Sequence, residues 1–178
     1  MFFRVLIATL MMSGSAFASE WTLAPDTSAL SFSGTQAGAP FEGQFENFTA
    51  DIVFDPAALE TAEITVTIDT ASARSGSPER DGALPGSDWF DVAAHPTASF
   101  AATNIQSTEE GYIANGTLTL KGTTQDVALP FSLSIEGDAA HVTGALTIDR
   151  NDYGVGTGAL SSMVGSDVTI HFNINATR

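Results

Sequence analysis

The chain has 178 residues, a formal net charge of −15 and no cysteine. That length is enough for one domain and short for two. The lack of cysteine excludes disulfide bonds, thiol catalysis and thiolate metal sites. Nucleic acid is not an expected partner, because the six Lys and Arg residues are scattered along the chain. The acidic balance also disfavours anionic membranes and favours solubility.

The first 18 residues have the pattern of a secretory signal peptide. Arg4 precedes an apolar run from Val5 to Met12, and Ala16-Phe17-Ala18 fits a cleavage site. The run is shorter than the ~20 residues that span a bilayer. We therefore expect an exported protein that does not span a membrane, with a signal peptide over 1–18 and a single domain over 19–178.

Beyond Trp21 the sequence has a period of two, which is typical of half-buried β-strands. The phase shifts between Phe45 and Phe48, as it does at a β-bulge. A short helical turn is expected over Ala57–Ala62. Alternation predicts eight strands, around residues 30–33, 41–54, 64–68, 98–105, 112–120, 127–135, 142–148 and 168–174.

Short turns between successive strands predict sequential antiparallel neighbours. Closing the meander into a barrel removes its two exposed edges. The sequence thus predicts an all-β, eight-stranded, up-and-down antiparallel barrel with a short helical crossover segment. The barrel interior is filled by side chains or holds one small ligand. An outer-membrane barrel shares the alternation, but the two Trp and two Tyr are too few for aromatic girdles.

The stretch from Asp81 to Phe100 interrupts this regularity with prolines, glycines and the cluster Asp88-Trp89-Phe90-Asp91. It is either a binding loop or a crossover that closes one end of the barrel. Paired carboxylates can perform acid–base chemistry or hold Ca²⁺, but Asp88 capping a short turn is the favoured interpretation. Glu79, Arg80 and Asp81 are expected to form a salt-bridged base for this loop.

No catalytic constellation is evident. His95, His141 and His171 lack ligand spacing, and the last two fall in the polar phase of their strands. The run Gly154–Gly158 has strand patterns on both sides, so it is a turn rather than a phosphate loop. Neither an enzyme, a metal site nor a cofactor is predicted.

A series of short motifs resembles the YceI-like family of bacterial exported proteins. The motifs are Trp21-Thr22-Leu23, Gly43-Gln44-Phe45, Phe54-Asp55-Pro56, Arg80-Asp81, Trp89-Phe90-Asp91, Pro96-Thr97-Ala98-Ser99-Phe100, Gly116–Gly122 and Tyr153-Gly154-Val155-Gly156. The resemblance implies a lipocalin-like barrel whose long apolar cavity binds a polyisoprenoid or quinone-type lipid. It also implies a periplasmic location and a homodimer. Residues 24–28 depart from the family's Asp-Pro-x-His-Ser pattern, so no role of that Asp or His is carried over.

These expectations define a candidate site. The predicted cavity wall and lid consist of Phe41, Phe45, Phe54, Ile68, Leu84, Trp89, Phe90, Phe100, Leu118, Leu129, Phe131 and Phe172. Arg74, Arg80 and Lys121 are the candidates for contact with a polar head group. The alternative is a structural barrel, filled by its own side chains, that docks an envelope redox or membrane partner.

Overall fold

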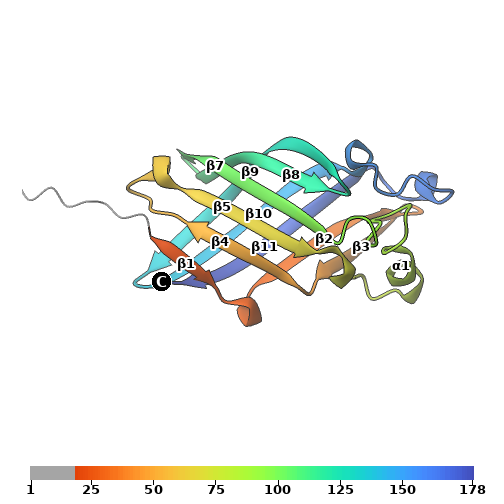
Figure 1. Ribbon diagram of the computed structural model, residues 1–178, viewed down its shortest axis with the longest axis horizontal. Coiled ribbons are helices and arrows are strands. Elements are labelled where there is room, and N and C mark those ends of the chain that lie inside the picture. Colours follow the sequence, from red (N-terminus) through yellow and green to blue (C-terminus); the bar gives the residue numbers. More distant parts are fainter. Residues whose placement is uncertain (1–18) are drawn as a thin grey trace, which may run out of the picture.

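The computed structural model describes residues 19–178, so the expected signal peptide lies outside the described residues (Figure 1). The strands are β1 (Glu20–Leu23), β2 (Ala29–Gln36), β3 (Ala39–Phe45), β4 (Phe48–Val53), β5 (Glu63–Asp69), β6 (Ala73–Arg74), β7 (Thr97–Thr108), β8 (Gly111–Leu120), β9 (Thr123–Glu136), β10 (Ala139–Asp149) and β11 (Asp167–Thr177). One α-helix, α1 (Pro78–Ala83), and five short 3-10 segments complete the described chain.

These strands form one closed antiparallel barrel. Neighbours follow the order β1-β4-β5-β7-β8-β9-β10-β11, and β1 closes the ring by pairing with β11. β1 and β2 both pair with β11 and together form one strand position of the barrel. β3 and β4, which pair with β2 and β1, together form the next position. Two of the eight positions are therefore strands with an interruption. The predicted all-β, eight-stranded antiparallel barrel is confirmed.

Strand pairing is longest on the side of the barrel formed by the C-terminal half. β10 and β11 pair along their whole length, from Ala139–Thr177 to Asp149–Asp167. β9 leaves β10 after the pair Phe131–Gly144, although it continues to pair with β8. The next pair would set Ala145 opposite Pro130, and proline has no N–H to donate. Pro130 therefore explains why the two strands diverge there.

Two local expectations change in detail. The helical turn predicted over Ala57–Ala62 is the shorter 3-10 segment η2 (Leu59–Thr61), which follows a turn in which Asp55 Oδ1 accepts from the Ala57 N–H. The helical crossover segment is α1, which begins at Pro78, just before the irregular stretch. Proline is favoured there because it fixes φ and needs no N–H partner. Asp88 lies in the loop beyond that helix. Among the described residues its main-chain carbonyl forms hydrogen bonds but its side chain does not, so the expected cap of a short turn is not formed.

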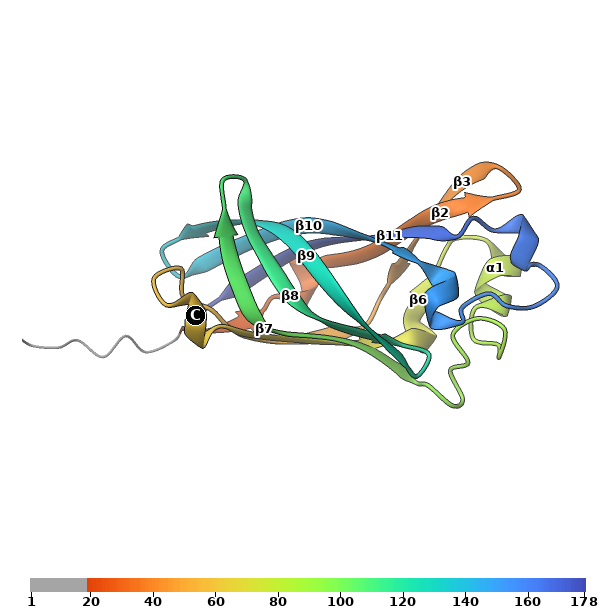
Figure 2. The ribbon, with the colours of Figure 1, turned by 90° about the horizontal axis from the view of Figure 1, so that it is seen from above.

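The two ends of the barrel differ, as Figures 1 and 2 show. One end carries both termini of the described chain, with Arg178 Nη1 donating to Ser19 Oγ at 3.2 Å. The other end carries α1, the loop from Leu84 to His95 and the β10–β11 connection with its 3-10 segments η4 (Arg150–Tyr153) and η5 (Ser161–Met163). Within residues 19–178, no helix is long and apolar enough to cross a membrane.

Candidate ligand-binding cavity

Apolar side chains of the strands converge on the barrel axis, but many of them are only partly covered. Ala114 is fully buried and Phe100 is 7% exposed, whereas many inward residues beside them remain partly accessible. A close-packed core would cover these side chains completely. The partial accessibility of Ile64, Leu129 and Val142, which all line the interior, therefore indicates a hollow barrel.

The hollow interior contains two adjoining cavities. The inner one has a volume of about 140 Å³ and is lined entirely by apolar residues, from Trp21 and Phe54 near the termini to Ile68 and Phe100. The second has a volume of about 390 Å³ and lies toward α1. Ile68, Leu118 and Ile170 line both cavities, so the two cavities adjoin across these side chains, and together we call them the apolar passage.

The end near the termini is closed by aromatic rings. Tyr112 stacks on Phe131 with centroids 5.3 Å apart, and Phe54 meets both rings edge-on. Trp21 Nε1 donates to the Phe54 carbonyl at 2.9 Å, which satisfies the indole inside the core. No polar side chain lines the inner cavity at this end, so a polar ligand group has no partner there.

All twelve apolar residues predicted for the site lie on the wall of this passage. The inner cavity is lined by Phe54, Ile68, Phe100, Leu118, Leu129, Phe131 and Phe172. The cavity toward α1 is lined by Phe41, Phe45, Leu84, Trp89 and Phe90, together with Ile68 and Leu118. Their contact with a ligand stays a prediction. Sequence reasoning omitted Ile52, Ile64 and Val66, which the same alternation would have found.

The loop Leu84–His95 and the β10–β11 connection close the α1 end together. The Asp88 carbonyl accepts from the N–H groups of Gly156 at 2.6 Å and Thr157 at 3.1 Å. Gly156 has a φ of 74°, and a Cβ there would lie 2.9 Å from the Trp89 ring. Asp88 thus links the two loops through its main chain, while Trp89 and Phe90 line the cavity below.

Arg150 is the structural centre of the β10–β11 connection, and no sequence pattern indicated this role. Its side chain is 4% exposed, yet it has no carboxylate partner among the described residues. All five of its N–H groups donate to main-chain carbonyls at 2.7–2.9 Å, those of Val155, Gly156, Ser161, Val164 and Gly165. Since a guanidinium has five N–H groups, none is left for a ligand.

Arg80 is placed differently, on α1 at the rim of the larger cavity. Its Nε donates to Ser75 Oγ at 3.0 Å and its Nη1 to Gln36 Oε1 at 3.1 Å, while its guanidinium lies 5.1 Å from the Phe41 ring centroid. Nη2 makes one longer bond, 3.4 Å to the Ser75 carbonyl. Two of the five N–H groups therefore remain available at the cavity.

The salt-bridged base expected from Glu79, Arg80 and Asp81 is wrong for the described chain, where the three residues bond to neighbouring serines instead. Asp81 accepts from the Ser75 side chain and main chain, and these bonds lower the pKa of its carboxyl. Glu79 has its pKa lowered by main-chain and Ser77 hydrogen bonds. Consecutive positions on a helix point in different directions, which keeps the three charges apart.

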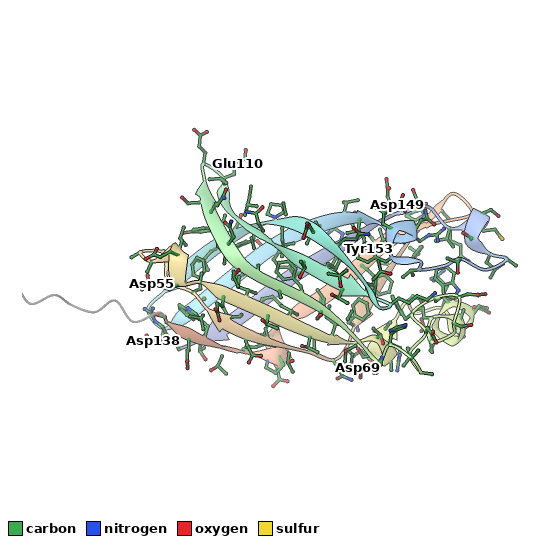
Figure 3. The ribbon with its side chains drawn as sticks, turned by 45° about the horizontal axis from the view of Figure 1, so that its top comes forward. Asp55, Asp69, Glu110, Asp138, Asp149 and Tyr153 are labelled. Carbon is green, nitrogen blue, oxygen red and sulfur yellow. The ribbon has the colours of Figure 1, made fainter. Side chains whose placement is uncertain are left out.

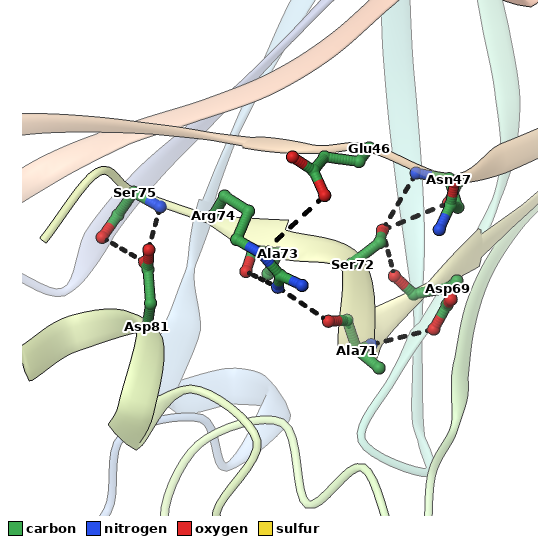
Figure 4. A network of polar contacts seen from close by, with 9 residues as sticks. All are labelled: Glu46, Asn47, Asp69, Ala71, Ser72, Ala73, Arg74, Ser75 and Asp81. Carbon is green, nitrogen blue, oxygen red and sulfur yellow. Dashed lines mark hydrogen bonds and ion pairs between the residues drawn. The ribbon is translucent and has the colours of Figure 1, made fainter. Parts of the chain in front are cut away.

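The other two head-group candidates lie away from the cavity wall. Arg74 is exposed and faces Glu46, with Nε and Oε2 3.8 Å apart (Figure 4). Lys121 donates to the Gly154 carbonyl at 2.7 Å and ties the β8–β9 turn to the β10–β11 connection. Neither lines the two cavities, whereas Arg80 does.

The remaining polar candidates show no clustering. His141 and His171 are exposed, as their strand phase predicts. The glycine run Gly154–Gly158 follows η4 in the connection between two strands and opens no α-helix. Among residues 19–178, no three His, Asp or Glu side chains are grouped as metal ligands would be.

A closed eight-stranded antiparallel barrel around apolar cavities defines the class of lipocalin-like barrels. The sequence matches the YceI-like domain over residues 21–176, so the chain belongs to the YceI-like family. A UPF0312 protein of Pseudomonas syringae pv. tomato is 30% identical over 171 residues, covering 90% of this chain and 89% of that protein.

Solved structures agree with this assignment. The crystal structure of Burkholderia cenocepacia BcnA is 33% identical, with a TM-score of 0.82 over 87% of this chain and 99% of that one. A YceI protein of Campylobacter jejuni is 24% identical, with a TM-score of 0.70 over 76% of this chain and 84% of that one. A polyisoprenoid-binding domain from Saccharophagus degradans has the same fold, at 18% identity and a TM-score of 0.67 over 88% of this chain and 97% of that one.

Proposed function

We propose that this protein is a periplasmic carrier for a long-chain isoprenoid-type lipid, which it binds without catalysis. The observation that carries the proposal is the apolar passage along the barrel axis, whose larger cavity alone has about 390 Å³. Ligand pockets usually have about 300–1,000 Å³. Further support comes from the Saccharophagus degradans domain, whose description names polyisoprenoid binding.

Burial of an apolar tail supplies enough free energy for such binding. Each buried CH₂ contributes ~0.8 kcal/mol, so a tail of about 20 carbons gains ~16 kcal/mol before ordering costs are subtracted. The inner cavity offers the tail no polar contact. The tail would therefore lie toward Trp21, with the head group at the opposite end.

The α1 end supports a neutral head group. Arg80 offers two N–H donors there, but Glu79 lines the same cavity and the whole chain carries a net charge of −15. A diphosphate would meet that negative field, although salt screens it beyond ~8 Å. A quinone carbonyl needs only a donor, which Arg80 provides. We therefore place a neutral, hydrogen-bond-accepting head beside Arg80.

The alternative, a structural barrel filled by its own side chains, is less well supported. It would require the phenylalanines, nine of which lie in residues 19–178, to fill the interior. Several of them instead form a ring-to-ring path along the cavity toward α1: Phe32 lies 5.2 Å from Phe45, and Phe45 lies 5.8 Å from Phe90. These rings line the open space without filling it.

The periplasmic location rests on the signal-peptide pattern of residues 1–18 and on the family. Fractionation of cells that produce the full chain tests it: the protein should appear in the periplasm without residues 1–18. An uncleaved protein retained in the cytoplasm would contradict this part of the proposal.

The binding function is tested by purifying the protein without detergent and analysing extracted lipids by mass spectrometry. We expect an isoprenoid lipid in near-stoichiometric amount, with a neutral head. Protein that is empty after purification and also refuses prenols and prenyl quinones in titrations would show that the proposal is wrong. Arg80→Met should weaken the binding of a prenyl quinone more than that of a prenyl hydrocarbon of equal length.

A further inference from the structure

A third cavity lies outside the barrel interior. It has a volume of about 590 Å³ and lies where β1 gives way to β2 and β3 to β4. Its lining mixes the two faces of the wall. Gln44 and Thr67 belong to the polar outer phase, whereas Leu30, Phe45 and Phe48 belong to the apolar inner phase. At this gap between strands, side chains of both faces of the strand layer border one opening.

On both sides of this opening, the described main-chain groups form hydrogen bonds to other segments and none across the opening. On the β2 side, the Ser28 hydroxyl and the Ala24 N–H bond to the main chain of Asn175 on β11. On the β4 side, the N–H of Glu46 donates to the Ser72 carbonyl at 3.2 Å, and the N–H of Asn47 to Ser72 Oγ at 3.0 Å (Figure 4).

These bonds hold the two interrupted strands apart. Pairing between them stops at Leu30–Phe45 on one side and at Thr22–Asp51 on the other. The opening therefore crosses the wall without any strand-to-strand hydrogen bond that would have to break. Only side chains separate it from the interior.

Three side chains form that partition. Leu30 and Phe48 line both the outer cavity and the inner cavity, and Phe45 lines both the outer cavity and the cavity toward α1. Leu30 is 7% exposed, whereas Phe45 and Phe48 are partly exposed. Side-chain rotation is fast compared with the opening of packed loops. The α1 end, by contrast, is closed by two loops that hydrogen-bond to each other.

We propose that this opening is a lateral window through which an apolar chain passes into the barrel, with Phe48 and Phe45 as its gate. The proposal rests on the lipid-binding function above, and it adds a route and a second, outer subsite. The rim of that subsite holds uncharged polar groups of Ser28, Gln44 and Thr67, and carboxylates of Glu46 and Asp69. It would receive a neutral head group during transfer rather than an anionic one.

The test measures the association rate of a benzoquinone that carries two isoprene units. The rate is monitored in stopped flow by the quenching of tryptophan fluorescence. Phe48→Ala should raise the association rate about tenfold, which corresponds to 1.4 kcal/mol in the barrier. Leu84→Ala probes the rival route, because it removes a large side chain from the α1 end only. It should raise the association rate far less than Phe48→Ala does.

A second pair of variants avoids the interior altogether. Thr67 and Thr65 are both exposed on β5, but only Thr67 lines the outer cavity. Thr67→Tyr should slow the association of the quinone several-fold, whereas Thr65→Tyr should not. The equilibrium affinity for the quinone should be the same in the two variants. Because both changes lie on the outer face, loss of folding does not explain a difference between them.

The outcomes separate the two proposals. The window would be overturned if the quinone binds at equilibrium but its association rate changes with Leu84→Ala and not with Phe48→Ala or Thr67→Tyr. The lipid-binding function would then still stand. Failure of the unaltered protein to bind the quinone at equilibrium would overturn the function, and the window as a lipid route with it.

Discussion

Arg150 shows at the residue scale how a buried charge can serve a loop instead of a ligand. Burying a guanidinium is costly unless its N–H groups are satisfied. Here five carbonyls of one connection converge on it, which fixes the segment from Val155 to Gly165 against the barrel. The lid over the cavity is therefore held by a side chain that lines the cavity but has no N–H group left for a ligand.

Replacing Arg150 tests this role. Arg150→Met would leave the buried carbonyls of Val155, Gly156 and Val164 without donors, and each such group costs about 1–3 kcal/mol. We expect the free energy of unfolding to fall by at least ~3 kcal/mol, measured by urea denaturation. The matched control is Arg74→Met, which removes the same charge from a side chain that is 47% exposed and should cost ~0–1 kcal/mol. Equal losses in the two variants would contradict the structural role.

At the scale of elements, the segment from Pro78 to Phe100 contains the helix α1, the loop that covers the cavity and the contact with the β10–β11 connection. α1 places Arg80 at the cavity rim, and main-chain hydrogen bonds such as Phe90 N–H to the Leu84 carbonyl, 3.0 Å, shape the following loop. This shape depends little on the Trp89 indole, which lines the cavity and lies against Gly156. The loop fold and the ligand contact are therefore separable.

Trp89→Ala should change lipid retention more than folding. Loss of about 1.4 kcal/mol of contact would raise the dissociation rate of a bound prenyl quinone about tenfold. The free energy of unfolding should fall by a smaller amount, and the association rate should stay the same if the lipid passes through the lateral window. Dissociation can be followed by transfer to acceptor vesicles. Equal loss of retention and stability would mean that the segment is only a plug.

The interrupted strand positions are the second feature at this scale. The phase shift between Phe45 and Phe48 indicated a bulge, and the structure shows that it coincides with a break between β3 and β4. The opposite break, between β1 and β2, falls at residues 24–28, where the sequence departs from the family pattern. A bulge in one strand can be recognised from a shift in its alternation of apolar and polar residues. An opening in the wall also requires that two strand interruptions lie side by side in the fold.

In the whole molecule, most charged side chains lie on the outside of the barrel and apolar ones line its interior. Figure 3 shows Glu110 projecting from the β7–β8 turn, and Asp55 and Asp138 lie at other turns of the barrel. The acidic side chains thus surround a barrel whose inner cavity is wholly apolar. A protein of this kind can stay dissolved while it shields a lipid tail.

The length of the apolar passage leads to a prediction for the whole barrel. Because each added CH₂ contributes ~0.8 kcal/mol, affinity should rise at least tenfold for each added isoprene unit until the tail reaches the aromatic end at Phe54 and Phe131. Beyond that length the affinity should level off. Titrations with prenyl quinones of one to eight units, monitored by tryptophan quenching, would show the rise and the plateau. An affinity that is independent of tail length would mean that the head group alone is recognised.

The sequence by itself determined the barrel and its inner face. Alternation forces every second side chain of a strand to one side, so Phe100, Leu118 and Phe131 had to point inward once the sheet closed. The same local rule could not reveal Arg150, because its five carbonyl partners come from turns with no periodic pattern. It also could not show whether the interior is hollow.

Tertiary structure alone decided which charges and openings matter. Arg80 lines the cavity, whereas Arg74 and Lys121 do not. The reason is that α1 docks against β2 and β3, where Arg80 contacts Gln36 and Phe41. The lateral window exists because Ser72 and Asn175, far apart in sequence, hold two neighbouring strands in different directions. Such features arise from contacts between distant segments, which local sequence patterns do not encode.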